Sequence, residues 1–208
     1  MDKSKVNYRM YLVTDRNVLK GRKLVEAIEE SIKGGAGIVQ LREKNVSSRE
    51  FLNIAKEVKS ITDKYDIPLI INDRLDIALA VNASGVHLGQ EDIPCKIARE
   101  ILGEDMIIGV SAHNLEEALK AEEDGADYIG CGAVFNTTTK EDTTNIKISD
   151  IKKIKKNINI KMVAIGGISE KNINQLQGTG IDGVAVVSAI LAKDDMKKAT
   201  EELLGVSL

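Results

Sequence analysis

The sequence predicts an α/β fold, a (β/α)8 barrel formed by a single compact domain over residues 1–208, on three observations. Short apolar runs rich in Val, Ile and Leu alternate with longer amphipathic segments along the whole chain. Such runs, bounded by Gly, Asp, Asn or Ser, are typical of strands buried on both faces. Eight runs occur at a mean spacing of roughly 25 residues, which fits one strand–helix unit. Eight such units in 208 residues predict a closed barrel, more compact than the ~250 residues usual for this fold.

The predicted strands share an aliphatic composition and a short length. They are Met10–Thr14, Ile38–Leu41, Pro68–Ile71, Gly85–Leu88, Met106–Val110, Tyr128–Val134, Met162–Ile165 and Val184–Val187. An open doubly wound sheet is the alternative, because periodicity does not exclude a reversal of strand order. The segment Gly130–Phe135 departs from the dinucleotide-binding fingerprint, and no Gly-Lys dipeptide marks a phosphate-binding loop.

The segments between the strands have helical spacing. Phe51 and Ala55 belong to an apolar stripe at i, i+3, i+4 and i+7, with charged residues beside it. Asn114 is placed to cap the amino terminus of the helix that follows it. Ser169 is a similar candidate before a predicted helix over Glu170–Gln177.

Composition excludes several classes of function. The chain has 29 basic and 32 acidic residues, a net charge of −3, which argues against a general binder of nucleic acid or anionic membranes. Aromatic residues make up 3% with no Trp, so a stacking platform for single strands is not expected. Neither an 18-residue apolar window nor a signal peptide is found, and two cysteines fit a reducing compartment. We therefore expect a cytoplasmic protein that binds neither nucleic acid nor a membrane.

Polar residues gather at the carboxyl ends of the predicted strands, where the catalytic groups of a barrel lie. Gln40, Arg42 and Lys44 alternate along the end of the second strand, so all three can point into the barrel mouth. Two cations and an amide at one point predict an anion site. A strand end with solvated charges is the simpler alternative.

Two carboxylates, Asp73 and Asp92, follow the third and fourth predicted strands. Carboxylates, water and substrate phosphate oxygens are the usual ligands of Mg²⁺. Each aspartate could instead cap the helix that follows it. Together, and beside Arg42 and Lys44, they favour a site for a metal ion and a pyrophosphate.

The ends of the last three strands offer hydroxyl and main-chain groups. A Thr-rich loop follows the sixth strand and runs to about Asn145. The Gly166-Gly167 pair and Ser188 follow the seventh and eighth strands, and Ala189–Ala192 could form a short helix. Phosphate sites in this fold are often built there from main-chain N–H groups. A solvated loop and simple turn geometry are the alternatives.

The histidines and cysteines are not assigned to catalysis. His87 lies within a predicted strand and fits a core histidine. His113 follows Ser111, but no orienting acid or oxyanion hole marks a Ser–His dyad. Cys95 begins a predicted helix, which can lower the pKa of a thiol, and Cys131 lies in a strand; both are interpreted as structural.

Seven motifs, in order along the chain, resemble the thiamine-phosphate synthase family. They are Gln40-Leu41-Arg42-Glu43-Lys44, Asn72-Asp73-Arg74, Gly85–Asp92, Gly109-Val110-Ser111, Phe135–Lys140, Ala164–Ile168 and Val187–Ile190. Each motif alone is weak, but seven in family order over nearly the whole chain are specific. Asn136 departs from the family pattern, in which many relatives have Pro.

The resemblance implies a transferase that joins two vitamin precursors. The donor is 4-amino-2-methyl-5-(diphosphooxymethyl)pyrimidine, and the acceptor is hydroxyethyl-thiazole phosphate, with or without a carboxylate that is lost. The products are thiamine phosphate and pyrophosphate. The resemblance also implies a single Mg²⁺ per active site and a dissociative displacement, in which pyrophosphate leaves before the thiazole nitrogen attacks.

Motif by motif, the resemblance implies roles for individual residues. The catalytic residues are Arg42, Lys44, Ser111 and Lys140. The pyrimidine diphosphate is bound by Gln40, Leu41, Arg42, Glu43, Lys44, Asn72, Ser111 and Lys140. The thiazole phosphate is bound by Thr137, Thr138, Thr139, Gly167, Val187 and Ser188. Asp73 and Asp92 bind Mg²⁺.

Two other functions stay open from the sequence. A thiazole tautomerase of the same fold would need a base for proton transfer and no diphosphate site, and the four charged residues Arg42, Lys44, Asp73 and Asp92 argue against it. A protein that binds a phosphorylated metabolite without catalysis is the second. We expect small-molecule partners, and the sequence leaves open the oligomeric state, a homo-oligomer included.

Overall fold

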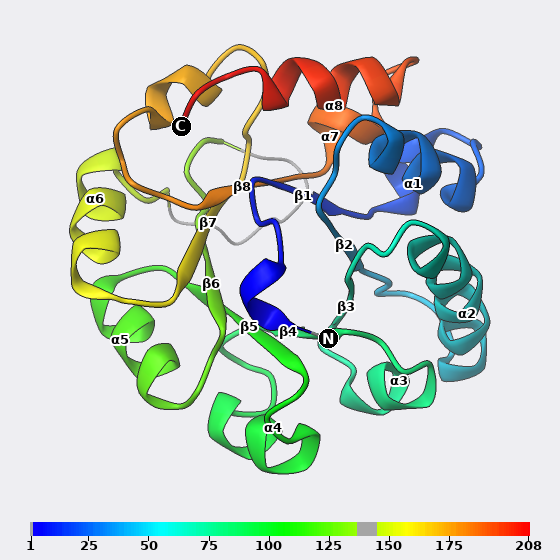
Figure 1. Ribbon diagram of the computed structural model, residues 1–208, viewed down its shortest axis with the longest axis horizontal. Helices are drawn as coiled ribbons and strands as arrows, with labels where there is room; N and C mark the ends of the chain where they lie inside the picture. The colour runs from blue at the N-terminus through cyan, green and yellow to red at the C-terminus, as the bar shows by residue number, and fades with distance from the viewer. Residues whose placement is uncertain (1, 137–144) are drawn as a thin grey trace.

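The computed structural model describes residues 2–136 and 145–208 and contains a closed barrel of eight parallel strands (Figure 1). The strands are β1 Met10–Val13, β2 Ile38–Leu41, β3 Leu69–Asn72, β4 Gly85–Leu88, β5 Ile107–Ala112, β6 Tyr128–Cys131, β7 Lys161–Ile165 and β8 Gly183–Val186. They pair in chain order, and β8 closes the barrel against β1. The predicted (β/α)8 barrel is confirmed, and an open sheet is excluded.

Helices surround the barrel on its outer face (Figure 1). They are α1 Leu24–Lys33, α2 Ser48–Lys64, α3 Leu75–Ala80, α4 Cys95–Leu102, α5 Leu115–Glu123, α6 Ile148–Asn157, α7 Ser188–Leu191 and α8 Met196–Leu204, with 3-10 turns η1 Lys3–Lys5, η2 Arg16–Leu19 and η3 Ile173–Leu176. Phe51 and Ala55 on α2 are buried, as their spacing predicts, and the Asn114 side chain caps α5 through the N–H of Glu117 at 2.9 Å. In the part of the chain that the structure describes, no helix combines the length and apolarity that a membrane span requires.

Two elements differ from the sequence prediction by more than two residues at one end. Strand β6 ends at Cys131 rather than Val134, because the chain at Gly132 approaches β7 so closely that a Cβ would lie 2.0 Å from the carbonyl oxygen of Ile165. The helix predicted over Glu170–Gln177 is only the short turn η3. There the Asn172 side chain accepts from the N–H of Ser169 and donates to the carbonyl of Gly167, both at 2.8 Å, and so holds these residues in a turn.

The apolar side chains form two layers, one on each face of the barrel wall. Along β2, Val39 and Leu41 belong to the outer layer between strands and helices, while Ile38 belongs to the barrel interior. This alternation follows the two-residue period of a strand. It directs Gln40 toward the axis of the barrel.

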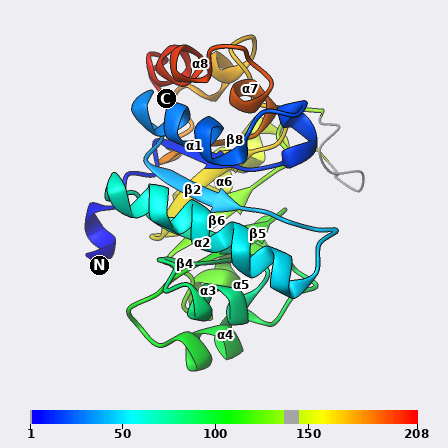
Figure 2. The same ribbon diagram turned by 90° about the vertical axis from the view of Figure 1, so that its right-hand side faces the viewer.

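Ion pairs fasten the amino-terminal end of the barrel, which lies at the left in Figure 2. Lys3 of η1 contacts the Asp127 carboxylate at 2.9 Å, just before β6. Asp182, just before β8, contacts both Lys155 at 2.7 Å and Lys161 at 2.8 Å. Residues at this end of a (β/α)8 barrel serve stability, which leaves the carboxyl ends of the strands for function.

Candidate active site

The end of β2 carries an amide and a guanidinium into the barrel mouth. Gln40 is buried, and its side-chain NH₂ donates to the hydroxyl of Tyr11 at 3.0 Å. The main-chain N–H of Arg42 donates to Thr14 Oγ1 at 3.0 Å, which ties this strand end to β1. The Arg42 side chain is 25% exposed, and among residues 2–136 and 145–208 the only carboxylate within ion-pair distance is Asp15 at 3.9 Å. Arg42 is therefore partly desolvated and only loosely paired, as a guanidinium that awaits an anion should be.

An acidic pair lies beside this strand end. Lys44 forms an ion pair with Asp73, and the Asn72 side chain donates to the other oxygen of Asp73 at 2.6 Å. The Asp92 carboxyl lies within hydrogen-bonding reach of Asp73 and accepts from the N–H of Gly89 at 2.7 Å. The ends of β2, β3 and the β4–α4 connection therefore place one ammonium group and two carboxylates together.

Helix capping does not explain the two aspartates. Helix α3 is preceded by Arg74 and helix α4 by Pro94, and neither cap involves an aspartate side chain. Asp73 also has a backbone φ of +62°, a left-handed conformation that is uncommon outside glycine. Such conformations concentrate at functional sites.

The donor set of this pair suits a divalent cation. Burial raises the pKa of the Asp92 carboxyl above its usual range, and the neighbouring Asp73 carboxylate adds to the increase, although the Gly89 N–H opposes it. Two carboxylates that repel each other are relieved by a shared cation, and oxygen ligands are those that Mg²⁺ prefers. No group of three or more acidic, His or Cys side chains gathers in residues 2–136 and 145–208, so the remaining ligands would come from substrate and water. The residues present fit Mg²⁺ on these terms.

Leu41 and Glu43 point elsewhere. The Leu41 side chain is fully buried in the outer apolar layer. The Glu43 side chain is 5% exposed and pairs with Arg16 at 2.9 Å. Its Oε1 is buried without a hydrogen-bond partner among the described residues. Alternate residues of this motif therefore point to opposite sides of the barrel wall. Gln40 and Arg42 are directed to the mouth, and Leu41 is directed to the helices.

Ser111 at the end of β5 lies on a buried hydrogen-bonded chain that the sequence did not reveal. Its hydroxyl lies 3.1 Å from His87 Nε2, and His87 Nδ1 lies 2.9 Å from the hydroxyl of Tyr128. His87 is thus within the barrel, as its strand position predicts, but its ring reaches the site. Gly109 makes room for Tyr128, because a Cβ there would lie 2.0 Å from the tyrosine ring.

The ends of β7 and β8 are neighbours. Ile165 pairs with Ala185, which brings the Gly166-Gly167 turn beside the Val187-Ser188 segment. Both glycines have positive φ, +100° and +64°, and α7 begins at Ser188. Main-chain N–H groups at such a turn and short helix can receive a phosphate. The residues Thr137, Thr138, Thr139 and Lys140, expected at the same mouth, lie outside the described residues.

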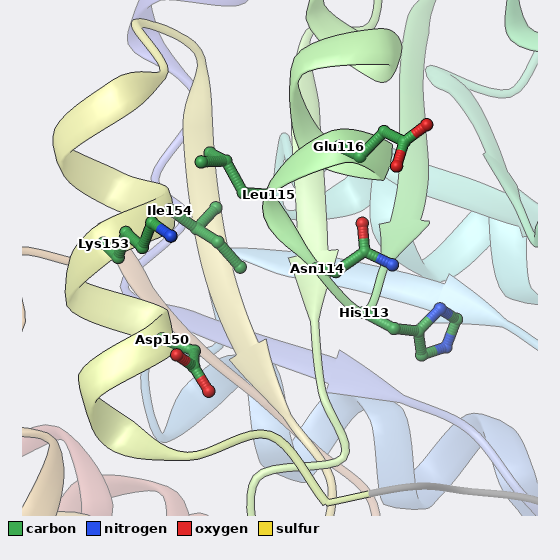
Figure 3. Close-up of a pocket in the computed structure, with 7 residues that line it drawn as sticks. All are labelled: His113, Asn114, Leu115, Glu116, Asp150, Lys153 and Ile154. Atoms are coloured by element: carbon green, nitrogen blue, oxygen red, sulfur yellow. The ribbon is translucent and has the colours of Figure 1, made fainter.

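The remaining candidates, His113 and the two cysteines, are engaged or buried outside the proposed site. The His113 imidazole contacts Glu117 at 2.8 Å. His113 also borders a groove between the first turns of α5 and α6, with its ring turned away from Asp150 on α6 (Figure 3). Burial raises the pKa of the Cys95 thiol to about 11, against the lowering that its place at a helix start suggested. Cys131 is also buried, so both thiols are structural.

Known sequences resemble this chain over nearly its full length. The protein family described as thiamine monophosphate synthase matches residues 10–190. A thiamine-phosphate synthase of Clostridium tetani (strain Massachusetts / E88) is 59% identical over 205 residues, which cover 99% of this chain and 98% of the relative. A thiamine-phosphate synthase of Clostridium novyi (strain NT) is 54% identical, with coverage of 97% and 99%.

A solved structure has the same fold. Thiamine phosphate pyrophosphorylase from Pyrococcus furiosus superimposes with a TM-score of 0.88 at 43% identity, and the match covers 95% of this chain and 94% of that one. Fold, motif order and full-length identity therefore agree. This chain belongs to the thiamine monophosphate synthase family.

Proposed function

We propose that this enzyme condenses the pyrimidine diphosphate with the phosphorylated hydroxyethyl-thiazole, giving thiamine phosphate and pyrophosphate, with Mg²⁺ held by Asp73 and Asp92. Membership of the family supports the overall reaction. The observation that carries the residue assignments is the convergence of Arg42 and Lys44 with this acidic pair. Its partners in this proposal are the two small-molecule substrates.

The pyrimidine diphosphate binds across the ends of β2 to β5. Arg42 and Lys44 contact its phosphates, and Asn72, which donates to Asp73, orients the acidic pair toward them. Mg²⁺, when bound, supplies charge neutralisation to the departing pyrophosphate. Lys44, which pairs with Asp73 in this structure, would contact a phosphate oxygen when Asp73 holds the cation. Fixed cations aimed at developing negative charge are the strongest contribution to catalysis of this kind.

The thiazole phosphate binds at the ends of β7 and β8. The main-chain N–H groups of Gly167, Val187 and Ser188 surround its phosphate, which separates it from the diphosphate near β2 to β5. This separation directs the thiazole nitrogen toward the methylene carbon of the pyrimidine. The thiazole nitrogen attacks that carbon after pyrophosphate has left, so positioning accounts for most of the rate.

Formation of this carbon–nitrogen bond needs no general base. The engagement of both histidines by neighbouring side chains is consistent with such a reaction. The attacking nitrogen carries no proton, and the charge of the thiazolium product is balanced by the pyrophosphate. His113 is engaged by Glu117, and His87 lies beneath the mouth in contact with Tyr128 and Ser111. Among the described residues, both imidazoles are engaged by neighbouring side chains, which argues against the proton transfer that a tautomerase requires.

One assay separates this function from the alternatives. The purified protein is mixed with both precursors and Mg²⁺, and thiamine phosphate and pyrophosphate are measured, with each precursor omitted in turn and Mg²⁺ removed by a chelator. Equimolar products that require all three components support the proposal. Conversion of the thiazole alone would indicate a tautomerase, and binding without turnover would indicate a non-catalytic protein; either result overturns the proposal.

A further inference from the structure

Five polar side chains from five strands form a continuous hydrogen-bonded chain through the barrel interior. The Gln40 NH₂ lies 3.0 Å from the Tyr11 hydroxyl, and the Tyr11 and Tyr128 hydroxyls lie 2.7 Å apart. Tyr128 lies 2.9 Å from His87 Nδ1, and His87 Nε2 lies 3.1 Å from the Ser111 hydroxyl. The two ends of the chain, Gln40 and Ser111, both face the proposed pyrimidine site.

The middle of the chain is shielded from solvent. Tyr11 and Tyr128 are at most 1% exposed, and His87 is 8% exposed. Burial raises the pKa of both tyrosine hydroxyls far above the usual range, so each keeps its proton. A buried hydroxyl proton needs an acceptor, because an unmade hydrogen bond there is costly. Each member of the chain therefore constrains the next.

The direction of the chain follows from its Gln40 end. The Gln40 NH₂ donates to Tyr11, so the Tyr11 proton is directed to Tyr128. The Tyr128 proton is then directed to Nδ1 of His87, which makes the imidazole a neutral Nε2–H tautomer.

The tautomer of His87 determines the direction of the hydrogen bond at the Ser111 end of the chain. The Nε2–H of His87 donates to Ser111 Oγ, which leaves the serine proton for another acceptor. At the opposite end, the side-chain carbonyl oxygen of Gln40 accepts no hydrogen bond from residues 2–136 or 145–208.

We propose that the Tyr11–Tyr128–His87 segment positions the substrate by fixing the direction of these hydrogen bonds. It holds the side-chain carbonyl of Gln40 as an acceptor and the Ser111 hydroxyl as a donor. An aminopyrimidine offers the complement, an amino donor next to a ring-nitrogen acceptor, whereas the 4-oxo analogue offers the reverse. The inference rests on the proposed function and adds a specificity role for three residues that are remote from the reacting atoms.

The sharpest test replaces Tyr128 by Phe. Tyr128→Phe keeps the ring that packs against Gly109 and removes the hydroxyl that joins Tyr11 to His87. Tyr8→Phe is the matched control, because its ring lies 5.2 Å from that of Tyr128 within the same interior cluster but outside the chain. Tyr11→Phe serves as a second variant should Tyr128→Phe not fold.

The measurement is the ratio of dissociation constants for the amino and the 4-oxo pyrimidine diphosphates, by calorimetry with Mg²⁺. Tyr128→Phe should reduce the preference for the amino compound at least ~10-fold and raise its KM by a similar factor, with the KM of the thiazole phosphate within about twofold. Tyr8→Phe should change neither quantity beyond about twofold. An unchanged preference in Tyr128→Phe, or an equal change in Tyr8→Phe, overturns the proposal.

A second readout does not depend on activity. The protein has two histidines, so ¹⁵N-histidine NMR gives signals from two imidazole rings. The variant His113→Gln removes one set of signals and so assigns the other to His87. We expect His87 as the Nε2–H tautomer in the wild type and a loss of that preference in Tyr128→Phe. An Nδ1–H tautomer in the wild type reverses the chain and overturns the inference. Failure of the proposed function would be recognised separately, since the wild type would then make no thiamine phosphate.

Discussion

Lys44 at the end of β2 forms an ion pair with Asp73 at the end of β3. Asp73 also lies within hydrogen-bonding reach of Asp92, so in the part of the chain that the structure describes one ammonium group faces two carboxylates. One cation leaves this pair with unbalanced negative charge, and Coulomb repulsion between carboxylates is strong at short range. A cation bound by Asp73 and Asp92 would therefore compete with Lys44 for the Asp73 carboxylate. The proposed mechanism uses this competition, because it requires Lys44 to contact a phosphate.

Removing Asp92 should weaken the response to Mg²⁺. We expect Asp92→Ala to raise the Mg²⁺ concentration for half-maximal activity at least ~10-fold, because a carboxylate ligand is lost. Circular dichroism should show an intact fold, since this strand-end residue is not part of the core. Asp76→Ala is the control, because this residue of α3 has a side chain that is 63% exposed and that pairs with Arg74, just before the helix. An unchanged Mg²⁺ dependence in Asp92→Ala would contradict the assignment.

Removing the Arg42 guanidinium should impair departure of the pyrophosphate. We expect Arg42→Ala to lower kcat/KM by at least ~10²-fold, about 2.7 kcal/mol of transition-state stabilisation. The exposed Arg49→Ala is the control and should lose less than about twofold. Initial rates with saturating Mg²⁺ give both values. A loss below about threefold in Arg42→Ala would make Arg42 a solvated strand-end residue with no role in the reaction.

Gly167 tests the placement of the two phosphates. A Cβ at Gly167 would lie 2.4 Å from the Asn136 carbonyl oxygen, and the residue has a φ of +64°. We expect Gly167→Val to raise the KM of the thiazole phosphate at least ~10-fold, with little change for the pyrimidine diphosphate, because the chain can no longer approach that phosphate. Initial-rate kinetics with each substrate varied in turn provide the measurement.

The control for Gly167 separates backbone strain from the loss of the phosphate contact. Gly178 lies in the turn before β8 and has a nearly identical φ of +65°, and a Cβ there would meet no atom within 4 Å. Gly178→Val should therefore show the cost of a positive φ alone, a smaller loss of thermal stability than Gly167→Val, with normal KM values for both substrates. If Gly167→Val raised the KM of the pyrimidine diphosphate alone, the placement of the two phosphate sites would have to be reversed.

The positions of the strands, and which residues of β2 face inward, could be predicted from the sequence because both depend on local periodicity. The apolar run at Ile38 determines which face of β2 is inward, and that decides the direction of Gln40 and Arg42. The end of β6 could not be predicted this way. There, contact between Gly132 and a strand that is distant in sequence overrides the local apolar pattern.

The buried chain was missed for a related reason. Tyr11 and Tyr128 are separated by 117 residues, and each alone resembles an apolar strand residue. A signal was nevertheless present. The protein has four tyrosines and no Trp, and two of these tyrosines fall on predicted strands at inward-facing positions. A buried hydroxyl requires a partner, so their coincidence in one barrel indicates a polar contact.

Asp182 tests the opposite, structural end of the barrel. Burial acts to raise the pKa of the Asp182 carboxyl, but hydrogen bonds from Lys155, Lys161 and the Met162 N–H outweigh it and lower the pKa below its usual value. A lowered pKa in the folded state contributes stability above the unfolded value of ~3.9, and that stability is lost as the pH falls through the folded value. The contribution is therefore present at neutral pH and disappears in acid.

Asp182→Asn should consequently destabilise the barrel in a pH-dependent manner. We expect a loss of about 1–2 kcal/mol in the free energy of unfolding at pH 7, reduced for partial exposure to solvent, with no effect on the KM of either substrate. The difference from wild type should begin to shrink below about pH 4, where the unfolded state takes up the proton, and should vanish once the pH has fallen below the lowered pKa of the folded state. The exposed Asp105→Asn should stay within about 0.5 kcal/mol at every pH. Denaturant unfolding across this range decides the matter, because a difference that does not depend on pH would mean that packing, rather than the charge of Asp182, holds this end of the barrel together.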